Sequence, residues 1–172
     1  MKKLIFILLI LILVSCKVTQ PAEKADFDSI LNSPKPQILF LDLFFRYDSL
    51  LNKSSAGLIN IKIVPGSLKT DFDSKEKAEK GDVIISFTDD KLNHLKTIII
   101  DNSFILKNEY SDEDGTLVWA ESKVTEREYS LRTRFASGSS YIIVKLLDKN
   151  NGRDTIELMK INLKEIFNEN AD

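Results

Sequence analysis

The strict alternation of apolar and polar side chains over residues 128–135 limits, more than any other feature, what this chain can fold into. One side of the alternation holds Tyr129, Leu131, Thr133 and Phe135. The other side holds Glu128, Ser130, Arg132 and Arg134. Successive side chains of a β-strand point to opposite faces of a sheet. The pattern therefore predicts an antiparallel strand with one face in a core and the other in water.

The same period of two recurs along most of the chain after residue 36. Residues 39–47 carry a large apolar side chain at every second position, and Ile59, Ile61 and Ile63 fall on one face of a second strand. Further β-rich runs cover residues 83–87, 97–100, 117–124, 141–147 and 155–163. Turn signals such as Pro65-Gly66 and Asp114-Gly115 separate the runs. About seven to nine short strands spaced in this way predict an all-β fold, an antiparallel β-sandwich of immunoglobulin-like or transthyretin-like type.

Three short segments depart from this period. Residues 73–80 are polar and helix-favouring, which predicts a solvated helix in a loop. Residues 163–168 predict a short closing helix, and residues 26–31 have room for one helical turn. We therefore expect little helix beside the strands.

The first sixteen residues have a separate organisation. Lys2 and Lys3 form a basic start, and residues 4–14 are an unbroken apolar run of eleven residues. A helix that spans a bilayer needs about 20 apolar residues, so this run is too short to be a permanent span. Its length and flanks are those of a signal-peptide core. The run ends beside Cys16, the single cysteine of the chain.

The sequence Leu13-Val14-Ser15-Cys16 resembles the lipobox of bacterial lipoproteins. The resemblance implies that residues 1–15 are cleaved and that Cys16 becomes a diacylglycerol-modified, acylated first residue. Residues 16–36, which contain three of the four prolines, would then be a lipidated N-terminus and flexible tether before a domain at 37–172. In that family, Lys17 in place of aspartate favours the outer membrane, periplasmic face. The inner membrane and the cell surface are the alternatives.

The length and charge balance of the chain exclude some classes of function. The 172 residues are enough for one domain with a sizeable core. Without Lys2 and Lys3 of the signal, the 24 basic side chains fall to 22, against 26 acidic ones. Nucleic-acid binding needs a concentrated basic surface, so we expect no nucleic-acid partner.

The inventory of reactive side chains argues against an enzyme. Lipidation would consume the thiol of Cys16, and His94 is the only histidine. A triad that uses His94 stays open in principle, because triads assemble from distant positions, but no Gly-x-Ser-x-Gly turn is present. Zinc would need further histidines or cysteines beside His94. We expect no catalytic residues, no metal, no cofactor and no small-molecule substrate.

Residues 110–121 have two interpretations. Four of them match an EF-hand loop by position: Asp112, Asp114, Gly115 and Glu121. Tyr110 stands where the first aspartate belongs, and the flanks alternate as strands rather than helices. We favour a β-hairpin whose tip is 112–115, with Gly115 at positive φ. Weak calcium binding at the tip is the alternative.

Two sets of charged side chains are candidates for contact with a partner. Arg132 and Arg134 lie on the outer face of their strand and would bind an acidic partner. Asp112 and Asp114 would present negative charge from the hairpin tip. The simpler interpretation of both sets is a solvated surface.

Three aromatic residues raise a question of burial. Phe40 and Phe44 lie opposite the main apolar face of the first strand, and we expect a second layer to bury them. The alternative is an exposed aromatic stripe that marks a partner site. Trp119 is expected in the core of the sandwich or at its rim.

Together these features predict a membrane-anchored periplasmic lipoprotein that acts as a non-catalytic binding or assembly module. It would be an accessory subunit of a cell-envelope complex, with a protein partner there. Its layout of signal, lipobox, tether and β-domain is similar to that of the transthyretin-like outer-membrane lipoproteins of type VI secretion. The alternative is an inhibitor or immunity lipoprotein that blocks an enzyme or toxin, and a hydrolase ranks behind both.

Overall fold

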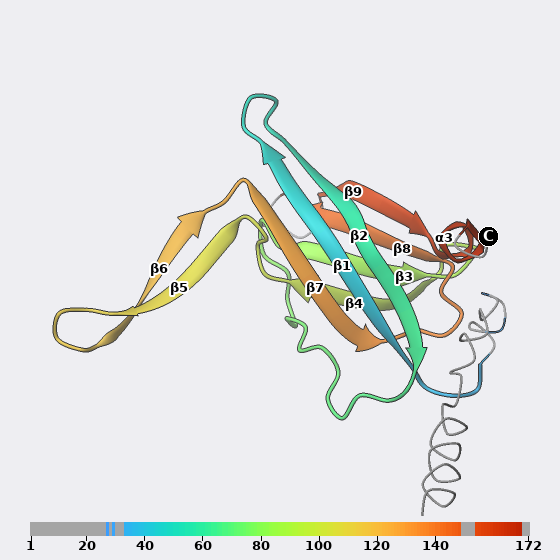
Figure 1. Ribbon diagram of the computed structural model, residues 1–172. Helices are drawn as coiled ribbons and strands as arrows, with labels where there is room; N and C mark the ends of the chain where they lie inside the picture. Colours follow the sequence, from blue (N-terminus) through green and yellow to red (C-terminus); the bar gives the residue numbers. More distant parts are fainter. Residues whose placement is uncertain (1–26, 28, 30–32, 149–153, 170–172) are drawn as a thin grey trace, which may run out of the picture.

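The computed structural model describes residues 27, 29, 33–148 and 154–169, which form nine β-strands and the C-terminal helix α3 (Figure 1). The strands of the first half are β1 Gln37–Asp48, β2 Lys53–Pro65, β3 Val83–Thr88, β4 His94–Ile100 and β5 Ile105–Ser111. Those of the second half are β6 Leu117–Lys123, β7 Glu126–Arg134, β8 Tyr141–Leu147 and β9 Thr155–Asn162, followed by α3 Leu163–Glu169.

Seven of the strands make two packed antiparallel sheets, which confirms the predicted all-β sandwich. One sheet has the order β2-β1-β7, and the other has the order β4-β3-β8-β9. The first strand is thus central in its sheet. In the immunoglobulin order the second strand of the sandwich separates the first from the fifth, and that is not the order found here. Strands β5 and β6 pair with each other as a separate two-stranded sheet.

The core lies between the two sheets, where the alternating pattern placed it. The inward side chains of β1 are fully buried, and they are Leu39, Leu41, Leu43 and Phe45. Val83, Ile85 and Phe87 of β3 meet them from the other sheet. On β7, Leu131 and Thr133 are buried as the alternation predicts, whereas Arg132 and Arg134 are exposed.

A β-bulge changes the face assignment in β2. Asp42 of β1 pairs with Asn60, but the next residue, Leu43, pairs with Leu58, so Ile59 is the extra residue. Ile59 is 52% exposed, whereas Leu58 packs against the core. The expectation that Ile59 shares the inner face with Ile61 and Ile63 is therefore wrong, because the bulge shifts the phase by one residue.

The helix expected at 73–80 is absent from the structure of that segment. Residues 73–80 run as an irregular loop against β4, where the N–H of Lys75 donates to the carbonyl of Ile99 at 3.3 Å. The hydroxyl of Ser74 accepts the N–H of Ile99 at 2.8 Å. These contacts with a strand edge replace the hydrogen bonds that a helix would make. The short closing helix is confirmed as α3.

One core residue comes from the segment predicted as a tether. Phe27 is buried, and its ring stacks on Phe167 of α3 with 5.7 Å between the ring centroids. The signal, the lipobox and Cys16 lie outside the described residues. Within the described residues, no helix is both long and apolar enough to cross a membrane.

Candidate functional site

The β5–β6 hairpin projects from one end of the sandwich (Figure 1). Its two strands pair over their full length, from Ile105 opposite Lys123 to Ser111 opposite Leu117. They pack chiefly against each other and have no extensive contact with another element of the described chain. Seven residues of extended chain reach about 23 Å, so the tip stands well clear of the core. We call residues 105–123 the projecting hairpin.

Large apolar side chains of the projecting hairpin face solvent. Trp119 is 66% exposed, Leu117 is 64% exposed and Tyr110 is 52% exposed. The prediction that Trp119 belongs to the core or its rim is therefore wrong. Its strand joins neither sheet of the sandwich, so the face that carries Trp119 has no second layer to pack on. Apolar area of this kind on a narrow projection is typical of a partner site.

The hairpin tip is a tight Asx-type turn. Oδ1 of Asp112 accepts the N–H of Asp114 at 3.1 Å and the N–H of Thr116 at 2.8 Å. Gly115 has φ +79°, which confirms the predicted hairpin and its positive-φ glycine. The strands on both sides rule out the helix-loop-helix frame of an EF-hand. Among the described residues, no group of three or more His, Cys, Asp or Glu side chains is placed to hold a metal ion.

A second apolar projection lies at the same end of the sandwich. The β1–β2 turn exposes Leu50 (94%) and Leu51 (73%). Its neighbour on the hairpin side is the β6–β7 junction, where the N–H of Tyr47 donates to the carbonyl of Thr125 at 2.7 Å. Sequence reasoning missed the two leucines, although an apolar pair between the turn residues Asp48 and Asn52 was a readable signal.

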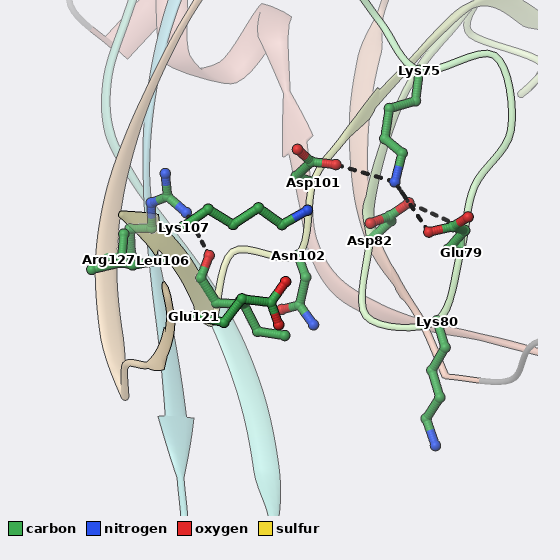
Figure 2. A pocket seen from close by; sticks show the side chains of 11 residues that line it. Lys75, Glu79, Lys80, Asp82, Asp101, Asn102, Leu106, Lys107, Glu121 and Arg127 are labelled. Atoms are coloured by element: carbon green, nitrogen blue, oxygen red, sulfur yellow. Dashed lines mark hydrogen bonds and ion pairs between the residues drawn. The ribbon is translucent and has the colours of Figure 1, made fainter. Parts of the chain in front are cut away.

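A charged pocket of about 310 Å³ lies at the base of the hairpin (Figure 2). At its centre Lys75 Nζ is 2.9 Å from Asp82 Oδ2 and 3.1 Å from Asp101 Oδ1. Lys107 of β5 and Glu121 of β6 bring one charge of each sign to the rim. The four basic and four acidic side chains of the lining balance: Lys75, Lys80, Lys107, Arg127, Glu79, Asp82, Asp101 and Glu121. The pocket therefore has no charge preference for a ligand, and its ion pairs tie the loop that carries Lys75 to the start of β3 and the end of β4.

Backbone contacts hold the same root. The N–H of Val124 donates to the carbonyl of Phe104 at 3.0 Å, and Nη1 of Arg127 donates to the carbonyl of Ile105 at 3.4 Å. The ring of Phe104 lies 6.0 Å from that of Tyr47. The hairpin thus has a fixed root and a free-standing outer part.

Replacing Lys75 with methionine is expected to lower the free energy of unfolding by about 2 to 3 kcal/mol. The hydrogen bond to Asp82 outweighs the effect of burial and raises the pKa of Lys75 well above its usual range. Asp82 is only 3% exposed, so loss of the ammonium leaves a buried carboxylate without its cation. Denaturant unfolding measures the loss. Lys77→Met, an exposed neighbour in the same loop, is the control and should change stability by under about 0.5 kcal/mol. Equal effects of both substitutions would contradict this role of Lys75.

A partly buried polar cluster joins the two sheets at the opposite end. Asp71, in the β2–β3 loop, lies 2.9 Å from Lys96 Nζ of β4 and accepts the hydroxyl of Thr133 of β7 at 2.8 Å. It also accepts the N–H of Arg134 at 2.9 Å. Burial alone raises the pKa of the Asp71 carboxyl, but hydrogen bonds from Lys96, Arg134 and Thr133 outweigh burial and hold that pKa well below its usual range.

The lowered pKa of Asp71 predicts acid sensitivity. The native state binds this proton more weakly than the unfolded chain, so Asp71 contributes stability above its unfolded pKa of about 4 and loses it as the pH falls below that value. Asp71→Asn should lower the free energy of unfolding by about 2 kcal/mol at neutral pH. It should also make the free energy of unfolding fall less steeply between about pH 4 and pH 2. Unfolding by denaturant across this pH range measures both effects. A wild-type slope in Asp71→Asn, or an equal change in the exposed control Asp73→Asn, would contradict the prediction.

The other residues singled out from the sequence occupy separate places. His94 is exposed on β4, and its Nε2 lies 2.5 Å from Thr97 Oγ1. Phe40 and Phe44 are half-buried on the outer face of the three-stranded sheet, which no second layer covers within the described chain. Full burial of these two rings is therefore not found. Arg132 lies on that face, with its guanidinium carbon 5.6 Å from the ring centroid of Phe40.

The structure does not bring the predicted partner residues together. Asp112 and Asp114 are at the hairpin tip, whereas Arg132 and Arg134 are at the end of β7 far from the hairpin (Figure 1).

No protein-family model matches the chain, and neither the curated proteins nor the solved structures contain a match to it.

Proposed function

We propose that this chain is a non-catalytic binding subunit, held to a bacterial envelope membrane through Cys16, and that it grips a protein partner with the projecting hairpin. The proposal rests on the exposure of Trp119, Leu117 and Tyr110 on an element that has no extensive contact with another element of the described chain. A two-stranded hairpin alone is marginally stable in water, so a partner that covers it would also stabilise it.

The hairpin offers two kinds of contact. Its paired strands leave two open edges of backbone N–H and C=O groups, which a strand of the partner can extend. Its exposed aromatic and leucine side chains are the residue types that anchor interfaces. The hairpin thus supplies both backbone hydrogen bonds and side-chain anchors for one partner.

The charge of the projecting hairpin indicates what kind of surface the partner presents. Residues 105–123 contain two lysines and five acidic residues, three of which lie at the tip: Asp112, Glu113 and Asp114. The complementary surface is an apolar groove with a basic rim. Lys and Arg on that rim would speed encounter and fix the orientation.

The position of the hairpin agrees with an anchored role. Pro36 precedes β1, and β1 runs from that end of the sheet toward the end that bears the hairpin. A strand of twelve residues spans about 40 Å. A domain attached to the membrane upstream of Pro36 would therefore hold the hairpin on its far side, facing the periplasm.

A hairpin deletion tests the proposal. Lys107 and Glu121 face each other in register, so residues 108–120 can be replaced by Asn-Gly, which closes a two-residue turn. The lipidated full chain with this change should lose the protein that co-purifies with the wild type after mild detergent extraction. Its thermal unfolding should stay within a few degrees of the wild type. Retention of the same co-purifying protein would overturn the proposal.

The acidic tip favours one second candidate, an inhibitor or immunity lipoprotein. A convex projection with three acidic residues at its end has the shape and charge to enter a basic active-site cleft. In that case the captured partner is an enzyme or toxin whose activity falls when the chain is added. Substituting Asp112 and Asp114 with asparagine would restore that activity.

A further inference from the structure

A set of exposed cations gathers at the end of the sandwich opposite the hairpin. There β1 begins, and β2 and β7 end, with Gln37 opposite Pro65 and Ile38 opposite Arg134. We define the basic patch as five exposed residues at this end: Lys35, Lys62, Lys69, Arg132 and Arg134. Phe40 pairs with Lys62 on one side and with Arg132 on the other, so these two cations stand two strand spacings apart, about 10 Å.

The acidic groups near the patch leave it positive. Asp71 is the nearest, but it is already engaged by Lys96, Thr133 and the backbone N–H of Arg134. Asp42, two residues along β1 from Phe40, accepts the side-chain amide of Asn60 at 3.2 Å. Glu128 lies four residues along β7 from Arg132. The Asp71–Lys96 pair cancels internally, and Asp42 and Glu128 lie farther along their strands from the cations of the patch.

The surface around the cations suits phosphate groups. Two hollows of about 560 and 370 Å³ adjoin the patch, one lined by Arg132 and residues 67–72 and the other by Arg134, Pro36 and Leu68. Nη2 of Arg134 donates to the carbonyl of Leu68 at 3.2 Å, which orients its guanidinium over the second hollow. One guanidinium group can donate two parallel hydrogen bonds to two oxygens of a phosphate. The half-buried rings of Phe40 and Phe44 add an apolar strip to the same face.

We infer that the basic patch lies against a membrane and binds the headgroups of anionic phospholipids. The inference rests on the proposed lipid anchor, because Phe27, which packs on α3, is only eleven residues after Cys16 and the chain then enters β1 beside the patch. An acyl anchor there would keep this end at high local concentration over the bilayer. The acidic hairpin is at the other end, so the charge distribution favours one orientation: patch toward the lipid and hairpin away from it. Each Lys or Arg near an anionic bilayer strengthens binding by about fivefold.

Vesicle binding without the acyl chains tests this inference. The probe is the mature chain, residues 16–172, with Cys16→Ser, mixed with vesicles of pure phosphatidylcholine or of phosphatidylcholine with one third phosphatidylglycerol. The chain should sediment with the phosphatidylglycerol vesicles only, and added salt should release it. The triple variant Lys62→Gln, Arg132→Gln, Arg134→Gln should bind at least tenfold more weakly.

A matched variant shows whether vesicle binding depends on the basic patch or only on the net charge of the chain. The triple variant Lys53→Gln, Lys80→Gln, Lys123→Gln removes the same charge from exposed residues near the hairpin end and should bind like the parent chain. Equal loss in both triples, or equal binding to both kinds of vesicle, would overturn the inference. It would also be overturned if the patch variant kept vesicle binding but lost a captured acidic protein.

Vesicle binding by the basic patch and partner capture by the hairpin can be lost separately. The hairpin-deleted chain should keep full vesicle binding, and the patch variant should keep the partner that the hairpin captures. If Cys16 is not lipidated, the wild-type chain will take up no acyl label. The vesicle assay does not depend on that result, because its probe carries Cys16→Ser.

Discussion

Replacing Trp119 with alanine is expected to weaken partner capture by about thirtyfold or more, which corresponds to about 2 to 4 kcal/mol of binding free energy. Trp119 is the largest exposed apolar side chain of the projecting hairpin, and tryptophan is among the residues that most often dominate an interface. The folded domain should be unaffected, because the side chain is already 66% exposed and its strand lies outside both sheets of the sandwich. Binding of the purified partner to immobilised protein, beside a thermal unfolding curve, measures both quantities.

Ile59 provides the matched control for this substitution. It is 52% exposed on β2, so it also presents apolar surface to water, but it lies in the three-stranded sheet rather than on the hairpin. Ile59→Ala should leave capture within about twofold of the wild type, which is the usual range for a residue outside a binding hot spot. The hairpin account fails if Ile59→Ala and Trp119→Ala weaken capture equally, or if neither does.

Cys16→Ser is expected to abolish lipidation of the chain. The thiolate of Cys16 is the nucleophile that would accept the lipid, and a serine hydroxyl does not replace it in this modification. Two or three acyl chains anchor a protein far more firmly than one. Without the modification the signal stays uncleaved or the chain stays unlipidated, so Cys16→Ser should take up no labelled palmitate, and uptake of the label measures the effect.

The chain contains no second cysteine, so labelling has only one thiol to report on. Lys17→Ala, one residue further on, is the control and should label like the wild type. Normal labelling of Cys16→Ser would overturn the lipoprotein interpretation and, with it, the orientation proposed for the basic patch.

The sandwich was predictable because burial imposes a period that a sequence displays. Leu39, Leu41 and Leu43 occupy alternate positions, and all three are fully buried. The hairpin at 110–121 was predictable for a related reason: Gly115 at the tip supplies the positive φ that a tight turn demands. Both predictions depend on local chemistry that neighbouring residues reveal.

The position of Trp119 was not predictable from the same pattern. Alternation shows that a segment is a strand, but it does not show which sheet the strand joins. The register places Trp119 opposite Glu109 and Leu117 opposite Ser111, so the face that carries the tryptophan also carries charge. Glu121, two residues along the same strand, adds a second charge to that face.

The bulge at Ile59 and the ion pairs at the hairpin root depend on contacts between distant segments. One extra residue in β2 turns Ile59 outward, and nothing in its neighbours specifies that extra residue. Lys75, Asp82 and Asp101 meet only because a loop, the start of β3 and the end of β4 converge. The basic patch arises in the same way, since Lys62 and Arg132 are far apart in sequence but flank the same residue of β1.

Site-specific crosslinking in intact cells identifies what the projecting hairpin contacts. A photoreactive phenylalanine analogue is placed at position 119 of the full-length chain, and in a second strain at position 59. If the projecting hairpin holds the partner, position 119 should give one discrete crosslinked protein and position 59 none. Crosslinks to the same protein from both positions, or from position 59 alone, would contradict it.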